Sequence, residues 1–485
     1  MSMDVVKRIA KNTFVLFSAN IVNLILGFFY GIYTARYLGA ENYGILSLAI
    51  AFISLFGVFT DIGLGQLTVR EVARDKSLAA KYLSNVSFLR LFLVVLAYGL
   101  VLICVHLLNY PEFTTKVIYV VAVSMVLSAF AGMLNSIFQA FEKMEYVSIS
   151  SILSNIVLLS GALFAISHGL NVMAFAVIYL LSGVVVLLFS IIIIIHLGIK
   201  PKFECDFEFI KDVFKRALPF GIGTLFFVYY LWIDRVILSV MLNETMVGYY
   251  SAAYTLVNAL SFIPNAFTTS LFPIMAYYFK NSDKSLNTIY RIGIKYMYML
   301  ALPIAVGTSL LGSNIIDIIY GPGFIMSAQA LKVLIWAEFF VYIDVLLSQM
   351  MYSINRERVT MIYAGVGTVL NIVLNIIFIP RFGLAGAAAA TLATEIWFFT
   401  IAYYVLSKSG YKINWMTMLP KPIISTFVMG IFILTFMQLP IAILIPIAAM
   451  IYFVVLYATK YISNEDFDLA RQVVAAKMKG PSQKV

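Results

Sequence analysis

Charged side chains stand inside stretches of the sequence that are otherwise apolar, and these are the positions at which chemistry is expected. A charge at the centre of a bilayer costs about 2.5–3.5 kcal/mol on insertion scales, so it needs a partner, a water-filled cavity or a function. The set consists of Asp61, Arg90, Asp234, Arg235, Glu338, Asp344 and Glu395.

The two arginines of this set suit a phosphate group. A guanidinium offers forked hydrogen-bond donors that match phosphate oxygens. The hypothesis is that Arg90, in the first half of the chain, and Arg235, in the second, face one central cavity and bind phosphate, with Arg36 as an outer contact. Two alternatives stay open. Arg90 is within two turns of a helix end, so its side chain can snorkel to the interface. Arg235 can instead form a structural pair with Asp61 or Glu338.

The carboxylates of the set suit a coupling ion. Asp61, Glu338 and Asp234 are candidates for coupling transport to H⁺ or Na⁺, and hydrogen-bonded packing is the alternative for each. A bound metal or another cofactor is not expected, because His106 and the two other histidines lack ligand spacing. The two cysteines do not suggest a disulfide framework.

Composition indicates that membrane-spanning helices position these residues. Of the 485 residues, 62% are hydrophobic and 12% charged, against about 25% charged in soluble proteins. The apolar runs have the length that crosses about 30 Å of hydrocarbon, and backbone groups in lipid must be paired within the segment, which requires helices. The sequence therefore predicts an all-α polytopic membrane protein.

About fourteen membrane helices are expected, and Pro264, Pro273 and Pro303 should interrupt the eighth and ninth of them. The expected ranges are 12–34, 44–66, 84–108, 117–140, 147–167, 172–197, 217–241, 246–272, 289–311, 328–352, 359–379, 384–407, 422–438 and 441–459.

The distribution of lysine and arginine predicts the orientation. If both termini are cytoplasmic, only Arg36, Lys116, Lys332 and Arg381 fall outside, and nearly all other cations fall inside. This is the bias that sets topology in membrane proteins. It predicts a multi-pass protein of the cell membrane, and it explains the net charge of +10 without nucleic acid as a partner.

Short repeated motifs indicate two lobes of equal topology. They keep one order and nearly one offset: Gly44 with Gly248, Asn155-Ile-Val-Leu with Asn371-Ile-Val-Leu, and Gly169-Leu with Gly383-Leu. Parallel repeats are common in transporters, where the substrate binds between them. The expected division is an N-lobe of six helices at 1–197, an amphipathic cytoplasmic linker at 198–216, a C-lobe of six helices at 217–409, two further helices at 410–460 and a cytoplasmic tail at 461–485.

The sequence resembles a known family over nearly its whole length. The segment Ala35-Arg-Tyr-Leu-Gly-Ala-Glu-Asn-Tyr-Gly44 resembles the hallmark after the first helix of the polysaccharide transporter (oligosaccharide flippase) family. This family belongs to the multidrug/oligosaccharidyl-lipid/polysaccharide exporter superfamily. Further similar motifs are Asp61-Ile-Gly-Leu-Gly65, Leu218-Pro219, Ile233-Asp-Arg235, Gly248-Tyr-Tyr250, Tyr320-Gly321 and Gly383-Leu-Ala-Gly-Ala-Ala388.

The resemblance implies a flippase that works by alternating access. The implied substrate is an oligosaccharide linked to polyprenyl or dolichyl (pyro)phosphate, moved from the cytoplasmic to the outer leaflet for surface polysaccharide or glycan assembly. The lipid II flippases of the superfamily carry extra arginines in their first two helices. Here Tyr30 and the stretch Leu48 to Phe59 supply none, which argues against that substrate.

Two other functions remain as alternatives. An ion-coupled multidrug exporter of the same superfamily is the nearer one, although such exporters usually have twelve helices. An enzyme is not expected, because the outer loops are short and nearly uncharged. There is no Gly-Lys-Ser/Thr motif for ATP, so energy must come from a gradient or from glycan consumption. The expected partners are the lipid-linked substrate, membrane lipids and glycan-assembly enzymes, for a monomeric protein.

Overall fold

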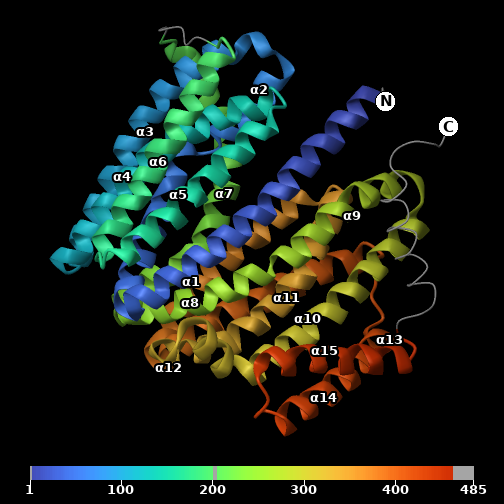
Figure 1. Ribbon diagram of the computed structural model, residues 1–485. Coiled ribbons are helices and arrows are strands. Elements are labelled where there is room, and N and C mark those ends of the chain that lie inside the picture. Colours follow the sequence, from blue (N-terminus) through green and yellow to red (C-terminus); the bar gives the residue numbers. More distant parts are fainter. Residues whose placement is uncertain (1–2, 200–204, 462–485) are drawn as a thin grey trace. The chain divides into compact units, whose positions relative to one another are not determined.

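The protein is built from helices, as Figure 1 shows for the computed structural model, which describes residues 3–199 and 205–461. No strand occurs among these residues, which confirms the expected all-α class. The α-helices are α1 (Met3–Asp61), α2 (Leu64–Arg74), α3 (Ala79–Leu108), α4 (Glu112–Ala140), α5 (Met144–Ser167), α6 (Val172–His196), α7 (Phe207–Met241), α8 (Glu244–Leu260), α9 (Phe262–Asn281), α10 (Asp283–Tyr320), α11 (Ser327–Ser353), α12 (Glu357–Lys408), α13 (Trp415–Met418), α14 (Pro420–Thr435) and α15 (Ile441–Ala458). Two short 3-10 helices, η1 (Lys76–Leu78) and η2 (Pro322–Phe324), complete the set.

Two of the long helices are each divided by a glycine. Gly39 divides α1 with φ 71° and ψ 172°, and Gly383 divides α12 with φ 56° and ψ −131°. Residues with a Cβ rarely adopt such angles, whereas glycine does so at little cost. Each helix therefore consists of two segments, and these correspond to the helices expected at 12–34 and 44–66 and at 359–379 and 384–407.

Eleven helical stretches among the described residues are long and apolar enough to cross a membrane. In this count each divided helix is one stretch, α8 is joined to α9, and α13 is joined to α14. The charged α11 is not among them, although its 27 residues cover the tenth expected range. Each of the other thirteen expected ranges also falls largely on a helix. The expected interruption occurs between α8 and α9, just before Pro264, whereas Pro273 and Pro303 lie inside α9 and α10.

The chain forms two compact units, which we describe separately. Of the described residues, unit 1 contains 3–199, 205–259, 316–330 and 361–394, and unit 2 contains 260–315, 331–360 and 395–461. The division into lobes at 1–197 and 217–409 stays a prediction. Part of the expected linker, residues 200–204, and nearly all of the expected tail, residues 462–485, lie outside the described residues. The end of the linker is not a separate helix, because α7 runs without a break from Phe207.

Unit 1 has a core of closely packed helices in which α4 runs along α6 and α1 along α5 (Figure 1). Near one end, Leu64 of α2, Tyr82 of α3, Phe138 of α4 and Ala217 of α7 share one buried apolar cluster. This cluster holds α3 and α7, the two helices that carry Arg90 and Arg235.

The second segment of α1 meets α8 at two glycines. A Cβ atom placed on Gly44 would overlap the carbonyl group of Glu244, and one on Gly248 would overlap the carbonyl group of Ala40. The two backbones therefore touch at a place where only glycine fits. The sequence pairs these glycines as equivalent positions of a repeat, and the structure brings them together.

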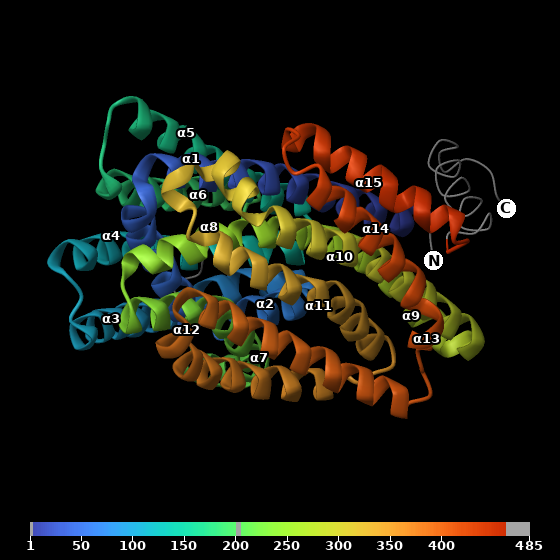
Figure 2. The same cartoon turned by 90° about the horizontal axis from the view of Figure 1, so that it is seen from below.

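Unit 2 carries the last helices of the chain on α10. In Figure 2, α14 and α15 run side by side, and the two helices pack against each other. Met299 of α10, Met429 of α14 and Leu444 of α15 share a buried cluster. The hydroxyl group of Tyr452 in α15 donates a 2.7 Å hydrogen bond to the carbonyl oxygen of Met299, which pairs both polar groups at membrane depth.

Candidate functional site

Arg235 lines a cavity of about 360 Å³ in unit 1. Its side chain comes from α7 and is buried, with 5% of the residue exposed. Asn23 of α1 and Thr255 and Asn258 of α8 add polar groups to the walls, which are otherwise mainly apolar or aromatic. The guanidinium of Arg235 thus lies at the wall of a partly open cavity.

The guanidinium of Arg235 is held between aromatic rings. Its Cζ atom lies 4.5 Å from the ring centre of Trp232 and 4.6 Å from that of Tyr254. These distances are typical of cation–π contacts, which stabilise a desolvated cation by about 2 kcal/mol or more. Nη1 donates a 2.8 Å hydrogen bond to the carbonyl oxygen of Leu231. The rings carry no negative charge, and Arg235 is the charged residue among the described residues that line the cavity.

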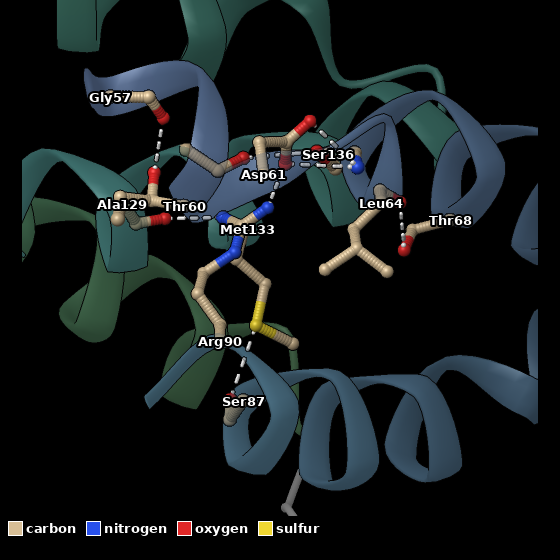
Figure 3. A network of polar contacts seen from close by, with 12 residues as sticks. Gly57, Thr60, Asp61, Leu64, Thr68, Ser87, Arg90, Ala129, Met133 and Ser136 are labelled. Atoms are coloured by element: carbon tan, nitrogen blue, oxygen red, sulfur yellow. Dashed lines mark hydrogen bonds and ion pairs between the residues drawn. The ribbon is translucent and has the colours of Figure 1, made fainter. Parts of the chain in front are cut away.

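Arg90 lies in a different environment, which Figure 3 shows. One guanidinium nitrogen forms an ion pair with Asp61, and another donates to the carbonyl oxygen of Ala129 in α4. Asp61 ends α1 and also accepts hydrogen bonds of 3.1 and 3.3 Å from the backbone N–H of Gly65 in α2. The pair therefore ties four helices together.

The structure places the two arginines in separate cavities. Arg90 and Asp61 line a second cavity of about 470 Å³, whose walls do not include Arg235. The structure therefore does not bring Arg90 and Arg235 to one cavity wall, and phosphate binding by both arginines stays a prediction. Within the second cavity the carboxylate of Asp61 forms an ion pair with Arg90. The guanidinium of Arg90 also does not snorkel to the surface, because its side chain is 2% exposed.

Arg36 lies next to the break at Gly39, exposed at the surface, and it is not part of the wall of either arginine cavity. Its role as an outer contact stays a prediction.

Asp234, the chain neighbour of Arg235, is the centre of a buried polar cluster. The hydroxyl groups of Tyr250 and Thr391 donate to Oδ2 at 2.7 and 3.2 Å, and the amide of Asn375 donates to Oδ1 at 3.1 Å. Asp234 is 1% exposed and the two polar α12 residues are similarly buried. The carboxylate thus lies deep in unit 1 with its lone pairs directed at neutral donors.

This cluster contains more oxygen atoms than its hydrogen atoms can satisfy. Nδ2 of Asn375 has two hydrogen atoms, yet it lies within 3.1 Å of three oxygens: Asp234 Oδ1, the Asn371 carbonyl oxygen and Asn371 Oδ1. Oδ1 of Asn375 is buried without a partner among the described residues. One buried acceptor of the cluster, Asn375 Oδ1, is therefore available to a proton or a small cation.

Glu338 of α11 contacts the chain at the break between α8 and α9. Its Oε1 accepts a 2.8 Å hydrogen bond from the hydroxyl group of Ser261, the residue between the two helices. One turn further along α11, the hydroxyl group of Tyr342 donates to the carbonyl oxygen of Leu260 at 3.1 Å. These contacts describe a structural role for Glu338, and its role in ion coupling stays a prediction.

Sequence reasoning identified Asp234 but missed most of its cluster. In the sequence Asn371 marks only a repeat and Tyr250 only a family motif, and nothing there points to Asn375 or Thr391. One signal was available: Asn371 and Asn375 are four residues apart, so they share a face of an otherwise apolar helix.

Comparisons with known proteins agree with this architecture. A Haloferax volcanii protein, named as a probable low-salt glycan biosynthesis flippase (Agl15), is 24% identical over 385 residues, which is 79% of this chain and 80% of that protein. The lipid II flippase MurJ in an inward closed conformation has a similar fold, with a TM-score of 0.77 and 18% identity over 92% of this chain and 99% of MurJ. An inward-facing multidrug transporter of the MATE family is similar as well, with a TM-score of 0.66 and 17% identity over 81% of this chain and 96% of its own.

A family profile decides the membership. The profile described as polysaccharide biosynthesis protein matches residues 9–279, more than half of the chain. The matched part includes Asp61, Arg90, Asp234 and Arg235. The chain therefore belongs to the polysaccharide biosynthesis protein family of membrane proteins.

Proposed function

We propose that this protein flips an oligosaccharide linked to polyprenyl or dolichyl (pyro)phosphate from the cytoplasmic to the outer leaflet by alternating access. The observation that carries the proposal is the buried guanidinium of Arg235 at the wall of a cavity. A lipid-linked glycan carries its charge on phosphate, and a desolvated guanidinium binds phosphate through strong, charge-assisted hydrogen bonds.

The aromatic rings around Arg235 support the same substrate. Trp232 and Tyr254 hold the cation by its faces, and among the described residues no carboxylate lines the cavity that Arg235 faces. Preorganisation lowers the entropy lost when a ligand binds. The membership in the polysaccharide biosynthesis protein family and a similar protein named for glycan flipping point the same way.

The Asp234 cluster is the proposed site of ion coupling. H⁺ or Na⁺ would neutralise the carboxylate and satisfy the unpaired oxygen of Asn375. Asp234 and Arg235 are adjacent in α7. The charge at one residue therefore acts on the other across a short distance of low dielectric, where charges interact strongly. Occupation of the cluster by a cation would thus alter the affinity of Arg235 for an anionic headgroup.

An ion-coupled multidrug exporter is the second candidate, and the fold similarity to a MATE transporter favours it. Exporters of cationic drugs need an uncompensated acidic cavity, because a cation is attracted by negative charge. The cavity of Arg235 has the opposite charge. The second cavity contains Asp61, but Arg90 neutralises it.

Deletion of the gene tests the proposal. Cells without the protein should accumulate a lipid-linked oligosaccharide that stays in the cytoplasmic leaflet, where a membrane-impermeant glycosidase or lectin cannot reach it. The same cells should export fluorescent dyes normally. Dye accumulation with normal surface glycan would support the exporter and contradict the flippase. Lysine tags at the two termini, probed with an impermeant reagent, test the proposed cytoplasmic location of both ends.

A further inference from the structure

The second cavity has a neutral, hydrogen-bonding wall, in contrast to the cationic cavity of Arg235. Asp61 and Arg90 are the charged residues that line it, and they form an ion pair. The remaining polar groups are hydroxyls and amides, among them Ser128, Gln66 and Gln139. A wall without net charge has little affinity for a phosphate, but it suits a neutral ligand rich in hydroxyl groups.

Two glutamines give this wall unused hydrogen-bonding capacity. Gln66 comes from α2 and Gln139 from α4, and neither side chain has a hydrogen-bond partner in the part of the chain that the structure describes. Each amide offers two donor hydrogens and an acceptor oxygen. Nε of Arg90 is also buried without a partner among the described residues.

The ion pair itself presents an acceptor to the cavity. The side chain of Asp61 is 42% exposed, whereas that of Arg90 is 2% exposed. Arg90 and the N–H group of Gly65 hold the carboxylate in place, and Asp61 lines the cavity. A fixed carboxylate beside free amides is an arrangement that recognises neighbouring hydroxyl groups, which donate and accept at once.

We propose that this second cavity binds the glycan part of the substrate through Gln66, Gln139 and Asp61, while Arg235 holds the phosphate in the first cavity. The inference rests on the proposed function, and it assigns the two chemical parts of one substrate to two sites in unit 1. It also gives the neutralised Arg90 a positioning role, since it orients Asp61 and does not bind phosphate.

Three probes separate the two sites in binding measurements with the full-length protein in nanodiscs. They are the lipid-linked oligosaccharide extracted from deletion cells, the free oligosaccharide released from it by mild acid, and undecaprenyl phosphate, which has no glycan. The variant is Gln66→Leu with Gln139→Leu, which removes the amides at nearly constant size. Gln329→Leu in α11 is the matched control, because Gln329 lines neither cavity.

The double variant should bind the lipid-linked and the free oligosaccharide about tenfold or more weakly, the effect of losing about two hydrogen bonds. Its affinity for undecaprenyl phosphate should equal that of the wild type, and the Gln329 variant should change nothing. Unchanged affinity of the double variant for the free oligosaccharide would overturn the inference.

Other results would contradict the proposed flippase function itself. They are deletion cells that accumulate no lipid-linked oligosaccharide, or a wild-type protein that binds neither an extracted lipid nor undecaprenyl phosphate. If the wild type binds the phosphate probe, Arg235→Gln abolishes that binding and the glutamine variants change no affinity, then only the assignment of the glycan to the second cavity is wrong.

Discussion

Asp234 and Arg235 are adjacent in α7, yet their side chains have different surroundings. The carboxylate of Asp234 accepts hydrogen bonds from Tyr250, Thr391 and Asn375. The guanidinium of Arg235 is held between the rings of Trp232 and Tyr254 and lines a cavity. Successive residues of a helix point about 100° apart, so one helix serves two environments. This geometry separates the proposed coupling site from the proposed headgroup site.

The exchange Asp234→Asn removes a charge and keeps the size of the side chain. It should abolish the response of transport to a Na⁺ or H⁺ gradient in proteoliposomes and slow gradient-driven flipping by at least about tenfold, because a neutral amide does not bind the coupling cation. Affinity for the lipid-linked oligosaccharide should remain measurable. Asp344→Asn, an exchange of a second carboxylate, in α11, is the control. Gradient-driven flipping that survives in the Asp234 variant would refute coupling at this site.

The Asp61–Arg90 pair predicts an asymmetric pair of stability effects. Asp61→Asn leaves the 2% exposed Arg90 without a counter-charge, which should lower the free energy of unfolding by about 3 kcal/mol or more. Arg90→Leu leaves Asp61, whose side chain is 42% exposed and hydrated, so its cost should be smaller.

Unfolding of the single and double variants in mild detergent measures this asymmetry. The double variant should lose less stability than the sum of the two single exchanges, because the pair interacts directly. Equal costs for the two single exchanges, or strict additivity, would argue against a buried guanidinium stabilised by Asp61.

The contact between Gly44 and Gly248 predicts a large effect of a single methyl group. A Cβ at either position would overlap backbone of the neighbouring helix, so Gly44→Ala or Gly248→Ala should destabilise the protein by about 1–3 kcal/mol through overpacking. Gly223→Ala in α7 is the matched control, because its Cβ would meet nothing within 4 Å. Thermal unfolding of the three variants checks this, and equal melting temperatures would contradict the close approach of α1 and α8.

Much of the fold can be predicted from the sequence because lipid restricts the secondary structure that an apolar segment can adopt. The helical ranges can be predicted because the backbone N–H and C=O groups of each apolar run must form hydrogen bonds within the run. The expected ranges agree with helices from α1 to α15. The pairing of polar groups was harder to predict. Asp234 and Asn375 are 141 positions apart, and their contact depends on how α7 and α12 pack. The sequence likewise suggested Asp61 as a partner for Arg235, whereas the packing of α1 on α3 and α4 gives it to Arg90.

Glu71 of α2 predicts a pH-dependent contribution to stability. Its carboxylate accepts hydrogen bonds from Arg216 of α7 at 2.7 Å and from Arg70 at 2.8 Å. Partial burial acts to raise the pKa of Glu71, but the hydrogen bonds from Arg216 and Arg70 outweigh it and hold the pKa below its ordinary value of 4.5. This stabilisation is fully present above pH 4.5 and is lost as the pH falls through the lowered pKa.

The exchange Glu71→Gln should therefore lower the free energy of unfolding at neutral pH by up to about 1 kcal/mol, the range of partly exposed ion pairs. The difference from the wild type should shrink as the solution is acidified below pH 4.5. A constant difference across this range, measured by denaturant unfolding at several pH values, would show that the ion pairs of Glu71 do not stabilise the contact of α2 with α7.

The most direct test of the flippase account is the rate at which Arg235 variants flip the extracted lipid-linked oligosaccharide in proteoliposomes. Arg235→Gln should reduce the rate by about 10- to 100-fold, the loss expected for charge-assisted hydrogen bonds. The rate of Arg235→Lys should lie between those of the wild type and Arg235→Gln, because lysine keeps the charge but lacks the forked donors of the guanidinium. Full flipping by Arg235→Gln at the wild-type protein level would contradict the account.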